Sequence, residues 1–352
     1  MEDRDTDPSH GGQSRNATAC DFRPSVALEY DPDMNPEDDI PSPSEPFMKV
    51  HNTCEKALYL HTRNSVGGQV LLLMWDAAVA NATHQALLSS PFPSRDGGPG
   101  SDIADAVMRW YVNSQLVALR RLIDAGDYKK KDRPTEPFRI ESERGVYSLR
   151  SILGYIRQHR ELFTRANLAG TFRYFMRPDV CWQAYLKSIT TDTARRVDLP
   201  SSPETSEEFH RSFDRIARVD AEHRKADDIV SDAYFKWLDD RLNRIEKRIK
   251  WVVDKRIAHA ASTTSHAENR RGVFWSEIDI CQREACRVYW SLCVHFIDSS
   301  NRSQFIAEPA YPIAYGMDNA SLGSSFAMSF EQAWNQYQDR VRQWSEFDSR
   351  FA

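Results

Sequence analysis

The feature that most constrains the fold is the spacing of the apolar residues. From Phe47 onward they recur at intervals of three and four over most of the chain. This spacing is typical of amphipathic α-helices, which bury one stripe of side chains. Alternation of apolar and polar residues, and the hairpin dipeptides that would join such runs, are essentially missing from the sequence. The sequence therefore predicts an all-α fold.

Polar stretches and Gly- or Pro-rich stretches divide this pattern into separate helices. Gly67 and Gly68 are expected to break the chain between the first two helices, and residues 192–204 are expected to form a polar loop. The predicted helices span residues 47–64, 69–88, 101–125, 148–167, 226–261, 278–297 and 329–347.

The predicted helix over residues 101–125 has apolar side chains on two sides. Leu116 and Leu119 belong to one stripe, and Trp110 and Val117 lie on the opposite side, since a helix turns about 100° per residue. A helix that is apolar on two sides is typical of the centre of a bundle. We therefore expect this helix to be packed by neighbours on both sides.

Residues 1–46 differ from the rest of the chain. They are rich in Asp, Pro, Ser and Gly and include an acidic, Pro-punctuated run over residues 31–46. A segment of this composition buries too little apolar surface to offset the entropy lost on ordering. The sequence predicts a disordered acidic tail that ends at Pro46.

The overall charge excludes one class of protein. With 46 Lys and Arg against 51 Asp and Glu, the net charge is −5, so the chain is not a globally basic nucleic-acid binder, although a local basic patch is compatible with it. The six cysteines form no CxxC pair, so no metal site is expected. Cys286 and Cys293 lie seven residues apart in a helical pattern, which predicts small buried side chains.

No membrane association is expected from the sequence. The charged first residues lead into no apolar stretch of a secretory signal, and the most apolar run, residues 70–75, is too short to span a bilayer. A cytoplasmic location is the expectation.

Charged residues at the end of the predicted helix 101–125 form the first candidate site. Asp124 follows Arg120 by four residues and Arg121 by three, so its carboxylate is expected to pair with either guanidinium. One interpretation is a structural salt bridge that anchors the following loop. The other is a contact to phosphate or to an RNA backbone.

The second candidate site lies at the end of the predicted helix 226–261. The apolar stripe of that helix, continued forward, runs through Arg256, and His259 lies about 60° to one side. Cationic side chains suit the C-terminal end of a helix dipole, so a structural role is one interpretation. A His beside an Arg is also suited to general-base catalysis of phosphodiester cleavage, with the Arg as charge stabiliser.

Three short motifs occur together in one order. They are Arg120-Arg121-Leu122-Ile123-Asp124, Val146-Tyr147-Ser148-Leu149-Arg150-Ser151-Ile152-Leu153 and Asp254-Lys255-Arg256-Ile257-Ala258-His259-Ala260. This order resembles the abortive-infection U-type branch of the HEPN-like proteins. The resemblance covers residues 47–266 and implies a HEPN-like helical bundle. Residues 267–352 follow the part that the resemblance covers, and we expect them to form a C-terminal helical extension packed on the same domain.

The resemblance implies a function in defence or in a toxin–antitoxin system. It implies RNA as ligand, a homodimer, an antitoxin or other protein partner, and RNA cleavage without a metal or cofactor. His259 matches the family histidine, and Arg256 is the nearby arginine, with Asp254 and Lys255 in the same motif. The positions where the family carries its arginine hold Val252, Val253 and Asp254 instead. The alternative function is a non-catalytic helical scaffold whose charged residues are buried and paired.

Overall fold

A computed structural model of the chain confirms the all-α fold. It describes residues 36–59, 65–89, 99–124, 140, 147–178, 181, 201–252, 275–297 and 324–345. Within these residues no β-strand occurs, and the one bridge between extended segments joins Thr164 to Ile229.

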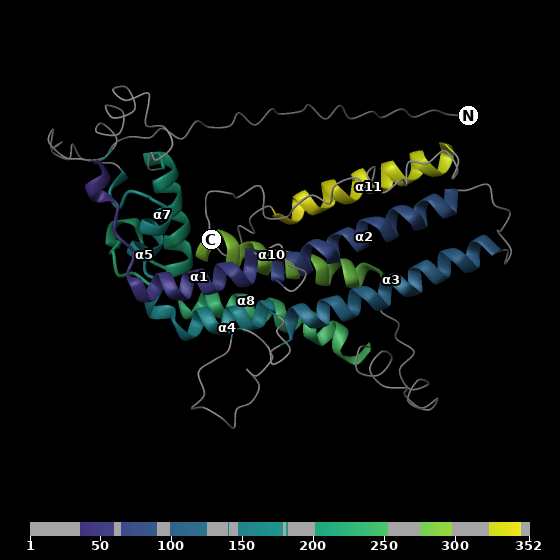
Figure 1. Cartoon of the computed structure of the whole chain (residues 1–352), viewed down its shortest axis with the longest axis horizontal. Coiled ribbons are helices and arrows are strands. Elements are labelled where there is room, and N and C mark those ends of the chain that lie inside the picture. The colour runs from purple at the N-terminus through teal and green to yellow at the C-terminus, as the bar shows by residue number, and fades with distance from the viewer. Residues whose placement is uncertain are drawn as a thin grey trace, which may run out of the picture.

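The long helices of the described chain lie side by side (Figure 1). They are accompanied by short 3-10 turns at Pro36–Asp39, Arg160–Leu162 and Ala221–His223. The α-helices are α1 (Glu45–Tyr59), α2 (Val66–Ser89), α3 (Pro99–Ile123), α4 (Leu149–Gln158), α5 (Arg165–Thr171), α7 (Pro203–Ala217), α8 (Asp232–Val252), α10 (Trp275–Phe296) and α11 (Ser324–Ser345).

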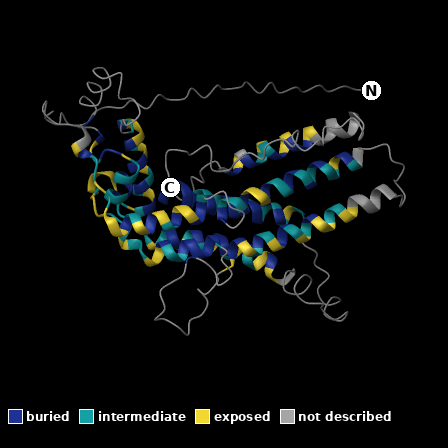
Figure 2. Ribbon diagram, viewed as in Figure 1, coloured by how far each residue is buried: buried dark blue, intermediate teal, exposed yellow. Residues whose placement is uncertain are grey.

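Helix α10 lies at the centre of the bundle. It packs against α8, α3, α2, α11, α4 and α1. Figure 2 shows it as largely buried, and Cys286 and Cys293 are both fully buried on it, as predicted. One hydrophobic core runs from α1 to α11, so α10 and α11 share the packing of the helices that precede them.

The expectation that α3 is the central helix is wrong. Leu116 and Leu119 are fully buried, but Trp110 is 55% exposed and Val117 is 41% exposed. The second apolar stripe of α3 therefore faces away from the core of the described chain. Helix α10 takes the central place because neighbours cover nearly its whole circumference.

The two glycines expected to break the chain instead begin α2. The hydroxyl of Ser65 accepts a hydrogen bond from Gly68 N at 3.1 Å, which caps the first turn. A side chain at Gly67 would meet the carbonyl oxygen of Leu58 at 2.6 Å and the hydroxyl of Tyr289 at 2.8 Å. The small residue at position 67 lets α1 and α10 approach α2 closely.

The single helix expected over residues 148–167 is divided in two. Helix α4 begins as predicted at Ser148, whose side chain and that of Ser151 form a capping box. It ends at Gln158, and Thr164 then adopts an extended backbone and caps α5 through its hydroxyl. Buried Phe163 lies at the turn, so core packing decides where the chain leaves the helix.

The long helix expected from Ala226 begins later, at Asp232. The carbonyl of Ala226 accepts a hydrogen bond from Ala166 N at 2.9 Å, and that of Asp228 accepts one from Arg165 N at 2.9 Å. These bonds hold the turn at Ala226 and Asp227, and the extended Ile229 after it, against the start of α5. The expected end of this helix at Ala261 lies outside the described residues.

Helix α7 was not expected from the sequence, and it begins inside the predicted polar loop. Ser202 caps it, accepting a hydrogen bond from Thr205 N at 3.2 Å, and Pro203 occupies the first turn. Proline is favoured there because the first backbone N–H groups of a helix have no partner within it.

The expectation that disorder extends to Pro46 is wrong for residues 36–46. Asp39 is 7% exposed and accepts hydrogen bonds from the backbone N and the Nε of Arg177 at 2.6 and 2.7 Å. Ser44 N donates to Asn167 Oδ1 at 2.9 Å. A segment of tail-like composition is thus held by hydrogen bonds rather than by apolar burial. Residues 1–35 lie outside the described chain.

None of the described helices combines the length and the apolar character needed to cross a membrane.

Candidate functional site

One of the two predicted sites lies within the described residues. Asp254, Lys255, Arg256 and His259 lie outside the described residues. Arg120, Arg121 and Asp124 lie at the C-terminal end of α3, where Arg121 and Asp124 are exposed and the Arg120 side chain is 32% exposed.

The end of α3 is fastened by the second motif of the sequence. The hydroxyl of Ser148 donates to the carbonyl oxygen of Asp124 at 2.5 Å, and Arg150 Nε donates to the carbonyl oxygen of Ile123 at 3.2 Å. The last carbonyls of a helix have no partner within it, and a cation there also suits the helix dipole. The first and second sequence motifs, at residues 120–124 and 146–153, therefore contact each other in the structure.

The carboxylate that joins this corner to α8 belongs to Glu246. It pairs with Arg150 at 3.2 Å and with Arg120 at 3.7 Å. The carboxylate expected to pair with Arg120 was Asp124. The tertiary structure instead supplies a partner from α8, which the spacing of residues on one helix does not reveal.

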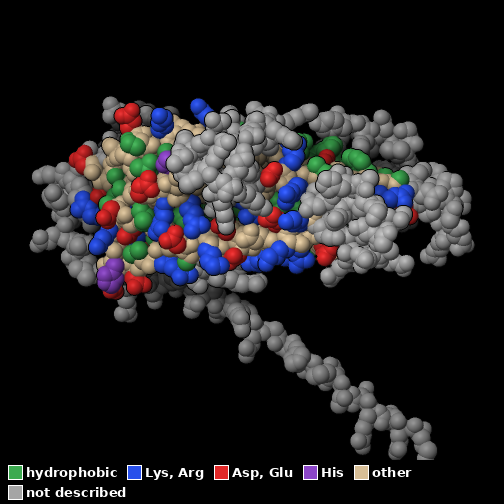
Figure 3. Space-filling view, turned by 90° about the horizontal axis from the view of Figure 1, so that it is seen from below, with side chains coloured by type: hydrophobic (Ala, Val, Ile, Leu, Met, Phe, Trp, Pro, Cys, Tyr) green, Lys and Arg blue, Asp and Glu red, His purple; other side chains and the backbone are tan. Residues whose placement is uncertain are grey.

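The second half of α8 is strongly basic. Arg244, Lys247, Arg248 and Lys250 are all exposed, and Glu246 is the one acidic residue among them. Since Glu246 is already engaged with Arg120 and Arg150, the cations of this segment outnumber the acids available to them. Figure 3 shows Lys and Arg side chains gathered over the middle of the face seen from below.

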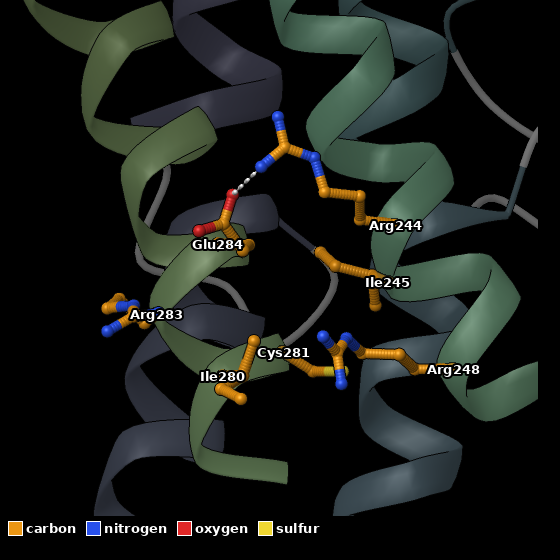
Figure 4. Close-up of a pocket in the computed structure, with 7 residues that line it drawn as sticks. All are labelled: Arg244, Ile245, Arg248, Ile280, Cys281, Arg283 and Glu284. Carbon is orange, nitrogen blue, oxygen red and sulfur yellow. Dashed lines mark ion pairs between the residues drawn. The ribbon is translucent and has the colours of Figure 1, made fainter. Parts of the chain in front are cut away.

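A recess of about 170 Å³ opens between this basic segment and α10. In the close-up of Figure 4, the guanidinium of Arg244 points toward Glu284 and that of Arg248 points toward Cys281, whereas Arg283 extends from the other side of α10. The residues that line it are Arg244, Ile245, Arg248, Ile280, Cys281, Arg283 and Glu284.

Glu284 is the anchor of this recess. Its side chain is 7% exposed, and it accepts a hydrogen bond from Arg241 Nη1 at 2.6 Å, whose side chain is 4% exposed. The guanidinium of Arg241 also lies 4.1 Å from the ring centre of Trp237. Buried charges are tolerated when paired in this way. Glu284 and Arg241 therefore neutralise each other inside the bundle.

The remaining arginines of the recess are weakly paired. Arg244 lies 4.0 Å from Glu284, and Arg248 lies 3.9 Å from Glu277. The Nε of Arg283 is buried and has no hydrogen-bond partner in the described part of the chain. Burial raises the pKa of the Cys281 thiol to about 12, so this side chain adds no negative charge at neutral pH.

This arrangement is suited to binding an anion. Guanidinium groups offer fork-shaped pairs of donors that match carboxylate and phosphate oxygens. The recess lining contains no histidine, which would be the usual general base. Among the described residues, no group of three potential metal ligands occurs either. The described site thus supports recognition of negative charge.

The basic run on α8 was not predicted as a site, although the sequence contains a signal for it. The apolar stripe of α8 is buried, and its residues Leu238, Leu242, Ile245 and Ile249 are all at most 1% exposed. The cations between the two isoleucines, and directly after them, must then face outward. The sequence alone could therefore predict that this run forms a basic face. It could not predict that Glu284, some 40 residues from Arg244, lies beside that face, because only the tertiary structure brings the two together.

Comparison with known proteins adds no relative, because no protein family, no curated protein and no solved structure matches this chain.

Proposed function

We propose that this protein binds RNA through phosphate contacts to the basic face of α8 and the arginine recess beside α10. The observation that carries the proposal is the set of four exposed cations from Arg244 to Lys250, a run whose one acidic residue, Glu246, pairs with Arg120 and Arg150. Lys and Arg side chains on one face supply the electrostatic attraction that dominates binding to nucleic acids.

The proposal includes membership in the HEPN-like proteins of a defence or toxin–antitoxin system. Two observations support it: the order of the three sequence motifs, and the contacts that bring Ser148 and Arg150 to the end of α3. Metal-independent cleavage by His259 and Arg256 is a second step of this proposal, based on the sequence motif alone. Binding is its first step, since the family arginine is replaced in this chain.

The test of binding uses the full chain and a short fluorescent single-stranded RNA. Replacing Arg244 and Arg248 together with alanine should weaken binding by about tenfold or more in fluorescence anisotropy. The slope of log affinity against log salt should fall by roughly 1.4, because each phosphate contact on a single strand contributes about 0.7. The matched control is Lys236→Ala, which removes an exposed cation from the same helix where it pairs with Asp240.

Equal losses of affinity in the double variant and in Lys236→Ala would contradict the proposal, because the effect would then reflect net charge alone. Incubation of the same RNA with the protein and a chelator tests cleavage. A product that disappears in His259→Ala supports catalysis, and intact RNA shows that the function is binding.

A second function, a non-catalytic interaction protein, is favoured by the exposed stripe of α3. Trp110 and Val117 lie one heptad apart on its outer face, 55% and 41% exposed. Contiguous exposed apolar patches mark contact surfaces, and Trp is enriched among the residues that dominate binding energy. Trp110→Asp should then lower the molecular mass measured by light scattering in solution, and an unchanged mass would exclude self-association through this stripe.

A further inference from the structure

We propose that the recess between α8 and α10 selects a phosphate monoester, the doubly charged phosphate at the end of an RNA or on a nucleotide. This inference rests on the proposed function, because it names the group that the same basic face would recognise. A monoester differs from the diesters along an RNA strand in charge and in the number of free oxygens. Three features of the recess, its charge, its size and the positions of its arginines, favour the monoester.

The first feature is the balance of charge. The guanidiniums of Arg244 and Arg248 line the recess, whereas Arg283 extends from the other side of α10, and the one carboxylate of the lining, Glu284, is already neutralised by Arg241. The lining therefore carries an excess of two positive charges. A phosphate monoester carries a charge of about −1.5 to −2 near neutral pH. A diester carries one negative charge and would leave part of this excess without a partner.

The second feature is the size of the recess. Its volume is about 170 Å³. This is room for one compact anionic group and a few waters. The recess opens onto the exposed side of α8, where Lys247 lies between the two recess arginines in the sequence. A strand could therefore continue along the basic face from its terminal phosphate.

The third feature is the positioning of the arginines. Glu284 is buried and contacts side chains from both helices: Arg241 at 2.6 Å, Arg287 at 3.8 Å and Arg244 at 4.0 Å. The long distance to Arg244 leaves its guanidinium able to turn toward a ligand, while the short bond to Arg241 keeps Glu284 in place. Apolar Ile245 and Ile280 complete the lining, and partial exclusion of water strengthens each charged contact.

The experiment compares the full chain with one RNA sequence carrying either a 5′-phosphate or a 5′-hydroxyl. We expect the phosphorylated RNA to bind about tenfold more tightly, the gain for one charge-assisted contact. Arg248→Ala should remove this difference, whereas Lys236→Ala should keep it. Inorganic phosphate and a nucleoside monophosphate serve as competitors, and they distinguish an RNA end from a free nucleotide as the source of the group.

Three outcomes separate this inference from the function on which it rests. Equal affinity for the two RNAs, with binding retained, overturns the monoester inference alone. Absence of RNA binding, with competition-sensitive binding of a labelled nucleoside monophosphate at the recess, overturns the RNA proposal and supports the monoester site. Absence of both overturns both. Arg248→Lys is a second variant that keeps the charge, and it should recover part of the preference because Lys lacks the paired donors of Arg.

Discussion

Two regions of the molecule use arginine in opposite ways. At one end of the bundle, Arg165 is 1% exposed and donates to Asp214 at 2.8 Å and to Asp228 at 2.9 Å. In the recess between α8 and α10, Arg244 and Arg248 are 56% and 41% exposed, and their nearest carboxylates lie at 4.0 and 3.9 Å. In the first region the charges are paired inside the protein, and in the second they are exposed to solvent.

The paired region is a closed network. Arg224 bridges Glu207 and Asp214 at 2.9 and 2.7 Å. His210 completes the network: its Nε2 donates to the carbonyl oxygen of Phe175 at 2.7 Å, so its Nδ1 accepts from Arg165 at 3.3 Å. Burial in a low-dielectric interior requires such complete pairing, because an unmatched charge there is costly. The contrast teaches that excess cations in this fold are found where solvent or a ligand can reach them.

The largest expected effect is from Arg165→Ala. It leaves Asp214 and Asp228, whose side chains are only 12% and 11% exposed, without this partner and should lower the free energy of unfolding by about 3–5 kcal/mol. Urea denaturation followed by circular dichroism measures this. Arg211→Ala is the control, since that side chain is 60% exposed in its pair with Glu207 and should change stability by about 0.5 kcal/mol or less. Similar midpoints for the two variants would break the comparison.

Two arginines of α8, Arg241 beneath the recess lining and Arg248 within it, should behave differently. Arg241→Ala removes the close partner of buried Glu284 and should cost about 2–3 kcal/mol of unfolding free energy, less than Arg165→Ala because Arg287 remains 3.8 Å from Glu284. Arg248→Ala should leave the urea midpoint nearly unchanged and weaken RNA binding. A large loss of stability in Arg248→Ala would show that it belongs to the paired group.

The paired region should also be sensitive to acid. Burial, and then the nearby Arg165 and Arg224, lower the pKa of His210 below its ordinary value of 6.5. The unfolded chain therefore takes up the proton first, so this contribution to stability is complete above about pH 6.5 and is lost as the pH falls through the lowered pKa. His210→Gln keeps a neutral donor and acceptor without titrating, and urea midpoints at pH 7 and pH 5 should differ less in this variant.

A second buried histidine provides the reference for that experiment. Burial lowers the pKa of His295 to about 4, and its Nδ1 lies 2.6 Å from the hydroxyl of Tyr234. Some acid destabilisation should therefore persist in His210→Gln. An unchanged pH dependence in that variant would mean that His210 does not contribute.

The smallest effect is expected from Asp124→Ala. The side chain is exposed, and the bond to Ser148 uses the backbone carbonyl oxygen of Asp124, which the substitution keeps. The unfolding free energy should change by about 0.5 kcal/mol or less. A loss of about 2 kcal/mol or more, typical of a broken buried pair, would contradict this expectation.

The periodic spacing of apolar residues was enough to predict the all-α fold, the buried stripe of α8 and the start of a helix at Ser148. These features depend on residues close together in the chain, and a helix repeats its contacts every three or four positions. Candidate residues Arg256 and His259 also came from local spacing, and their role stays a prediction.

Other features required partners far apart in the sequence. The second apolar stripe of α3, with Trp110 and Val117, predicted that this helix lies at the centre of the bundle. The stripe is exposed, and α10 lies at the centre instead. Arg120 pairs with Glu246 of α8, whereas the sequence predicted a pair with Asp124. Glu284 of α10 lines the recess beside the basic run of α8.

What the sequence by itself determined is which segments become helices and which of their faces are apolar. The tertiary structure alone decided which charges are paired and which stay available. The physical reason is that the energy of a charge depends on its burial and on the partner brought beside it, and neither is a property of the local sequence.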